Sequence, residues 1–122
     1  MGKEMTLSAA SLAYLGDAVF ELLVRTMLVE NGEQTVNEFN RLAKGYVSAK
    51  AQAALYHKVI DQLTDEEQAI LKRGRNLNPQ SRAKNASVSD YRHATGLETL
   101  FGYLYTCGRH ERLQELFAFC TQ

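Results

Sequence analysis

Two carboxylates, Asp17 and Glu98, lie within apolar stretches of the chain that have the pattern of helices. An ionised carboxylate among apolar residues is costly unless a cation or a hydrogen-bond donor compensates it. If the two helices pack side by side, both acids point into one pocket and suit a hard divalent cation. Such an ion polarises a phosphodiester and activates water to attack it. A second interpretation stays open, in which both acids are structural and pair with Arg25, Arg92 or backbone donors.

Glycines accompany both acids. Gly16 directly precedes Asp17, and Gly96 and Gly102 flank Glu98. Because glycine destabilises a helix relative to alanine, two glycines within one helix need a compensating role. Close approach of the two helices would supply that role and would bring the two carboxylates within reach of one ion.

Positive charge is concentrated in one segment, although the chain of 122 residues has a formal net charge of zero. Residues 68–89 carry five basic residues and no acidic one, whereas residues 1–67 carry ten acidic and six basic residues. The segment has no aromatic side chain to stack on single-stranded bases, so its basic and amide side chains favour the phosphates and ribose hydroxyls of an RNA duplex. The alternative is a solvated loop without a ligand. The candidate RNA contacts here are Lys72, Arg73, Arg75, Asn76, Arg82, Lys84 and Asn85.

The hydrophobic periodicity predicts a single all-α domain, residues 1–122, of about six helices. The first helix is expected from the N-cap Ser8 to about Glu30, covered by other helices on several sides because most of its circumference is apolar. Thr35 and Thr64 each precede a glutamate with capping-box spacing and begin two further helices. The other expected helical ranges are 36–44 (ended by Gly45), 49 to about 63, Thr64 to about 73, 87 or 89 to 107, and about 110–119, with a basic RNA-binding loop at 74–87.

Composition and motifs exclude several classes of protein. The two cysteines, Cys107 and Cys120, lack metal-ligand spacing, and the chain has neither a signal peptide nor a long charge-free apolar run. These features predict reduced thiols, no membrane association and a cytoplasmic location. The glycine motifs of nucleotide-binding proteins and the elbow of serine or cysteine hydrolases are absent from the sequence.

Several separate motifs resemble one enzyme family. Segment 12–19, Leu-Ala-Tyr-Leu-Gly-Asp-Ala-Val, resembles the signature helix of the ribonuclease III family, and segment 98–105, Glu-Thr-Leu-Phe-Gly-Tyr-Leu-Tyr, is similar to its second catalytic helix. Segments 46–53, 73–76 and 94–98 are similar to a short branch of that family, the Mini-ribonuclease III enzymes. That branch lacks a double-stranded-RNA-binding domain, and none is expected here because the chain ends shortly after its last helix. The resemblance covers nearly the whole chain.

The resemblance implies a ribonuclease III endonuclease domain that forms a homodimer, with the signature helices at the two-fold interface. It implies hydrolysis of double-stranded RNA with Mg²⁺, or Mn²⁺ in its place, Asp17 and Glu98 being catalytic residues and metal ligands. The products implied are 5′-phosphate and 3′-hydroxyl ends, and the substrate is precursor 23S (large-subunit) ribosomal RNA. The larger family has further acids where this chain has Ala13 and Thr95, which leaves the number of metal ions open. Thr95, through a water molecule, and Glu21 are expected to act on the metal indirectly.

The basic loop is then expected to hold the RNA duplex in place of the missing binding domain, with Lys50 and Gln52 on the third helix as further RNA contacts. The rival interpretation is a catalytically inactive double-stranded-RNA-binding or ribosome-associated module, which lost its activity with the two missing acids. A third interpretation is a helical dimerisation adapter without a role in RNA metabolism.

Overall fold

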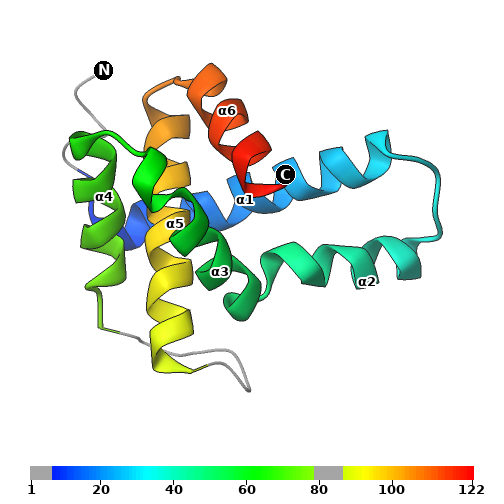
Figure 1. Ribbon diagram of the computed structural model, residues 1–122, viewed down its shortest axis with the longest axis horizontal. Helices are drawn as coiled ribbons and strands as arrows, with labels where there is room; N and C mark the ends of the chain where they lie inside the picture. Colours follow the sequence, from blue (N-terminus) through cyan, green and yellow to red (C-terminus); the bar gives the residue numbers. More distant parts are fainter. Residues whose placement is uncertain (1–6, 79–86) are drawn as a thin grey trace.

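The computed structural model describes residues 7–78 and 87–122, and every regular element in these two ranges is helical (Figure 1). The predicted all-α fold class is confirmed. No helix in this part of the chain has the length and apolar character needed to cross a membrane. In chain order, the elements are α1 (Ala9–Glu30), α2 (Val36–Val47), α3 (Ala49–Val59), the short 3₁₀ helix η2 (Ile60–Gln62), α4 (Asp65–Arg75), α5 (Val88–Thr106) and α6 (His110–Cys120).

Side-chain caps fix where five of these helices begin. In each, the hydroxyl of a serine or threonine accepts a hydrogen bond from the backbone N–H three residues further on, which satisfies one of the free donors of the first turn. At α4 the glutamate of the motif also accepts from the backbone of the cap, which completes a capping box. The caps are Ser8, Thr35, Ser48, Thr64 and Ser87.

Three predicted helix ends differ from the observed ones, two of them by no more than a turn. Gly45 lies inside α2, which continues to Val47, because an exposed glycine costs a helix only about 1 kcal/mol and the next turn packs against the core. The third α-helix ends at Val59 and is followed by the 3₁₀ turn, not by further α-helix to residue 63. The fourth continues to Arg75, so the predicted loop does not begin at Gly74.

The helix α5 lies at the centre of the fold, and α1, α3 and α4 all pack against it (Figure 1). Its fully buried residues Leu97, Phe101 and Leu104 belong to the hydrophobic core, where the Phe101 ring meets the Phe20 ring of α1 edge to face at 5.4 Å between centroids. The second half of α1 extends away from this body, and α2 returns beside it as an arm (Figure 1).

As expected, α1 packs against several helices, α2, α4 and α5, but part of its apolar surface stays uncovered in the single chain. Tyr14 is 87% exposed, Leu22 64% and Val29 59%. Tyr14 and Leu22 are left uncovered by the other described elements, whereas Val29 borders an open pocket between α1 and α2. The apolar circumference that predicted a central helix therefore includes a surface that is open in the monomer.

The backbones of α1 and α5 touch where two glycines meet. A Cβ atom at Gly16 would lie 1.7 Å from the carbonyl oxygen of Glu98, and one at Gly102 would lie 2.0 Å from the carbonyl oxygen of Leu12. Any side chain at either position would force the two helices apart. The predicted close approach of these helices is confirmed.

A second pair of glycines sets α4 against the other side of α5. A Cβ atom at Gly74 would lie 2.1 Å from the hydroxyl oxygen of Thr99, and one at Gly96 would lie 2.8 Å from the carbonyl oxygen of Leu71. This contact explains why α4 continues past residue 73, since Gly74 can pack on α5 only as part of the helix.

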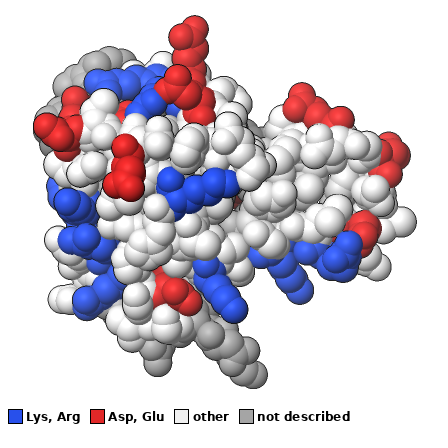
Figure 2. Space-filling view, viewed as in Figure 1, with Lys and Arg blue, Asp and Glu red and all other residues white. Residues whose placement is uncertain are grey.

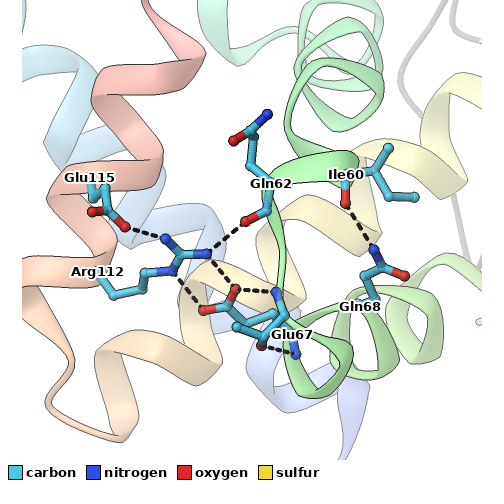
Figure 3. A network of polar contacts seen from close by, with 7 residues as sticks. Ile60, Gln62, Glu67, Gln68, Arg112 and Glu115 are labelled. Carbon is cyan, nitrogen blue, oxygen red and sulfur yellow. Dashed lines mark hydrogen bonds and ion pairs between the residues drawn. The ribbon is translucent and has the colours of Figure 1, made fainter.

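A partly buried ion pair joins α6 to the beginning of α4 (Figure 3). Arg112 donates from Nε and Nη2 to the two carboxylate oxygens of Glu67 at 2.8 and 2.7 Å, and Nη2 also donates to the carbonyl oxygen of Gln62 at 2.9 Å. Glu67 accepts in addition from the backbone N–H of Thr64 at 3.0 Å. The hydrogen bonds from Arg112 hold the pKa of Glu67 below its ordinary value, so this buried acid is ionised and fully compensated.

Substitution of Gly16 by alanine is expected to destabilise the protein by about 3 kcal/mol or more, because the new methyl group would meet backbone atoms of Glu98 that cannot rotate away. Urea denaturation followed by circular dichroism measures the change in the free energy of unfolding. Gly45→Ala is the matched control, since nothing lies within 4 Å of a Cβ atom there. This control should gain roughly 0.5–1 kcal/mol from its higher helix propensity. A Gly16→Ala variant as stable as the parent would contradict the backbone contact.

Candidate active site

Asp17 and Glu98 line the same open pocket, of about 250 Å³, between α1, α5 and the residues that follow α4. Asp17 directly follows Gly16, the residue that touches the backbone of Glu98, so the contact between the helices brings the two acids to one place. Asp17 is exposed and Glu98 is half-buried. The residues that line the pocket are Ala10, Ala13, Tyr14, Asp17, Leu77, Asn78, Tyr91, Thr95 and Glu98.

The two acids perturb each other. Burial, the negative charge of Asp17 and a hydrogen bond between the two carboxyl groups raise the pKa of Glu98 to about 8, while a hydrogen bond from the side chain of Gln52 acts in the opposite direction. At neutral pH the pair therefore keeps a proton unless a cation compensates both charges. Perturbed acids of this kind are typical of functional sites.

Basic side chains of the described chain do not neutralise this pair. Arg25 donates instead to Glu21, at 3.1 Å from Nε and 2.9 Å from Nη2. Within residues 7–78 and 87–122, no lysine, arginine or histidine nitrogen lies within 4.0 Å of either carboxylate of the pair. The alternative in which Arg25 or Arg92 pairs with Asp17 or Glu98 is therefore not what this part of the chain adopts.

The donor set fits a hard divalent cation. No group of three or more histidine, cysteine or acidic side chains gathers as a metal centre in the part of the chain that the structure describes. Magnesium is commonly held by one or two carboxylates, with water and substrate oxygens completing its shell, so a pair of acids at an open pocket is sufficient. Thr95 also lines the pocket, and its hydroxyl donates to the carbonyl oxygen of Tyr91 at 2.9 Å, which leaves the oxygen free to accept.

The predicted RNA contacts occupy different environments. Lys72, Arg73 and Asn76 are exposed at the end of α4, in a region where Figure 2 shows several basic side chains. Arg75 is half-buried, and its Nη1 donates to the hydroxyl of Tyr56 at 3.2 Å. Lys50 is exposed on α3. Three further candidates lie outside the described residues: Arg82, Lys84 and Asn85.

Gln52, predicted as a further RNA contact, is not at the surface. Its side chain is buried, with 2% exposed, and forms a hydrogen bond with Glu98. Neither Gln52 nor Asn78 was assigned to the acidic site from the sequence. The signal for Gln52 is its register, because Tyr56 and Val59, four and seven residues further on, are buried on the same face of α3.

Comparison with known proteins agrees with this geometry. The family described as Ribonuclease III domain matches residues 10–109. A Mini-ribonuclease 3 of Enterococcus faecalis is 47% identical over 116 residues, which cover 93% of this chain and 88% of the relative. A Mini-ribonuclease 3 of Symbiobacterium thermophilum is 44% identical, with 95% and 89% covered.

A crystal structure of a protein from Fusobacterium nucleatum superposes with a TM-score of 0.84 at 32% identity, covering 91% of this chain and 90% of that one. The chain thus has relatives at the levels of both sequence and structure. The chain belongs to the ribonuclease III family, whose members are endoribonucleases that act on double-stranded RNA. Within that family, its curated relatives bear the name Mini-ribonuclease 3.

Without divalent cations, the stability of the parent protein relative to Glu98→Gln is expected to fall as the pH rises from about 5 to about 8. The unfolded chain releases the proton of Glu98 near its ordinary pKa of 4.5, whereas the folded chain keeps it until about pH 8, so a rising pH favours unfolding. The difference in unfolding free energy should change by at most about 1.4 kcal/mol per pH unit. Thermal or urea denaturation in EDTA at stepped pH measures it. Parallel curves for the two proteins would contradict the raised pKa.

Proposed function

We propose that this protein cleaves double-stranded RNA by Mg²⁺-dependent hydrolysis, with Asp17 and Glu98 as the metal ligands. The observation that carries the proposal is that two acids 81 positions apart in the sequence share one pocket without a basic partner in the described chain. Membership of the ribonuclease III family supplies the reaction class.

Each protein group has a defined part in this reaction. Bound Mg²⁺ supplies positive charge that stabilises the phosphate in the transition state and makes water a stronger nucleophile. Asp17, exposed at the pocket, and Glu98, which is half-buried, would hold the cation once Glu98 has released its proton. The Thr95 hydroxyl oxygen would accept a hydrogen bond from a water molecule in the pocket. No side-chain nucleophile is required, and the products are 5′-phosphate and 3′-hydroxyl ends.

The natural substrate that we propose is the precursor of 23S ribosomal RNA, cleaved by a homodimer in the cytoplasm. Relatives that bear the name Mini-ribonuclease 3 support RNA as the substrate class, within which the ribosomal precursor is our narrower proposal. The exposed apolar side chains of α1, Tyr14 and Leu22 among them, support a two-fold interface along this helix. Two copies would then present two acidic pockets, one for each strand of the duplex.

A second candidate function is a catalytically inactive module that binds double-stranded RNA or the ribosome. Ala13 and Thr95 favour it, since both line the pocket at positions where the larger family has acids. Cleavage distinguishes the two candidates, because binding alone needs neither a divalent cation nor Asp17.

Asp17→Asn is expected to abolish cleavage of a long RNA duplex, by at least about a hundredfold, because the amide lacks the charge that holds the cation. The assay compares parent and variant in Mg²⁺ and in EDTA on a denaturing gel, with circular dichroism as the control for folding. Glu30→Gln is the control, because it removes an exposed acid at the opposite end of α1 from the pocket, and it should keep most of the activity. Cleavage by Asp17→Asn at the rate of the parent would refute the metal-ligand role.

Replacement of both Lys72 and Arg73 by alanine is expected to weaken duplex binding and to reduce the slope of log affinity against log salt by about two, one for each lost phosphate contact. Binding is measured by fluorescence anisotropy in EDTA, which keeps the RNA intact. The control removes two exposed charges from α2, Arg41 and Lys44. An unchanged slope on replacement of Lys72 and Arg73 would place the RNA elsewhere than α4.

A further inference from the structure

Three polar residues are almost fully buried in the described chain: Gln52 and Glu67, each 2% exposed, and Thr99, which is not exposed at all. Buried polar groups need hydrogen-bond partners, and two of the three have structural ones. Glu67 binds Arg112 and caps α4, and Thr99 donates to the carbonyl oxygen of Thr95 in its own helix at 2.7 Å. Gln52 is different, because its side chain reaches from α3 to Glu98, an acid of the pocket.

Contacts one helical turn before and one turn after Gln52 fix its position. Ser48 caps the first turn of α3, and the backbone N–H of Gln52 donates to the carbonyl oxygen of Ser48 at 2.9 Å. One turn further on, Tyr56 is 2% exposed and accepts from Arg75 at the end of α4. These contacts, together with the packing of α3 on α5, hold the buried amide of Gln52 at a fixed place beside α5.

We propose that Gln52 is a positioning residue for Glu98, whose carboxylate it holds by a hydrogen bond in the orientation that binds the divalent cation together with Asp17. The inference rests on the proposed role of Glu98 as a metal ligand. An amide suits the task because it stabilises an ionised carboxylate without cancelling its charge, as lysine or arginine would. Partners that orient metal ligands typically change metal affinity or activity by 10- to 100-fold when they are removed.

Gln52→Met tests the proposal, because methionine has a similar volume and shape but cannot donate to Glu98. Mn²⁺ is the probe, and its binding to the intact protein in the absence of RNA is measured by isothermal titration and by the electron paramagnetic resonance of free Mn²⁺. Affinity is expected to fall by about tenfold. Binding of duplex RNA in EDTA should stay at the level of the parent, since the buried amide does not contact RNA.

Thr99→Val is the matched control. It also replaces a buried polar group beside Glu98 by an apolar one of similar size, but its hydroxyl donates within α5, so Mn²⁺ affinity should not change. A Gln52→Met protein that binds Mn²⁺ as tightly as the parent would overturn the inference, and so would an equal loss of affinity in Thr99→Val. If Gln52→Met does not fold, the parent protein is titrated with Mg²⁺ instead and followed by NMR. Binding of Mg²⁺ should then shift the resonance of the Gln52 side-chain amide. An unshifted resonance at saturating Mg²⁺ would overturn the inference.

The same Mn²⁺ measurements distinguish an error in the proposed metal site from an error in the role of Gln52. A parent protein that does not bind Mn²⁺, or a Glu98→Gln variant that binds it equally well, would refute the metal site itself and this inference with it. Loss of Mn²⁺ binding in Glu98→Gln together with parent-like binding in Gln52→Met refutes only the role of Gln52.

Discussion

The rest of the site depends on the contact between the backbones of α1 and α5 at Gly16 and Gly102. Because neither residue has a side chain, the two helices approach until backbone atoms meet, and the acid next to Gly16 arrives beside Glu98. Gly74 and Gly96 repeat the device on another side of α5. The central helix is therefore held at backbone distance by two neighbours, which leaves Glu98 little freedom to move away from Asp17.

Two glutamates in this chain show opposite solutions to the cost of burying an acid. Glu67 accepts two hydrogen bonds from Arg112 and one from a backbone N–H (Figure 3). These contacts lower its pKa, so the carboxylate stays ionised and links α4 to α6. Glu98 receives a neighbouring acid and one amide, and its pKa is raised. The described part of the fold compensates Glu67 completely but leaves the pair of Asp17 and Glu98 without a cationic side chain. That pair can therefore attract a cation from solution. Electrostatics of the described chain thus separates the structural acid, Glu67, from Glu98, the acid that we propose as a metal ligand.

Features that depend on residues close together in the sequence could be predicted, whereas features that depend on tertiary contacts could not. Helix caps depend on residues three positions apart, so Ser8, Thr35 and Thr64 could be assigned correctly. The glycines beside both acids predicted close helix packing, because glycine destabilises a helix interior unless a packing contact compensates. Gly45 makes no such contact, and treating it as a helix breaker predicted an end of α2 that is wrong. Gln52 reads as a polar surface residue unless the face of α3 that packs on α5 is known, and that face is decided by tertiary contacts.

The exposure of Asp17 was the other unexpected feature, and it bears on how the pair can act. Of the two acids, one is half-buried and perturbed, while the other lies among exposed apolar residues of α1. Water around Asp17 weakens its hold on a cation, because charges interact more strongly where solvent is excluded. A second copy packed along α1 would remove that water. In the proposed homodimer, the interface that buries Tyr14 and Leu22 would also exclude water from around Asp17. The apolar face of α1 would then strengthen the interaction of the acidic pocket with a cation.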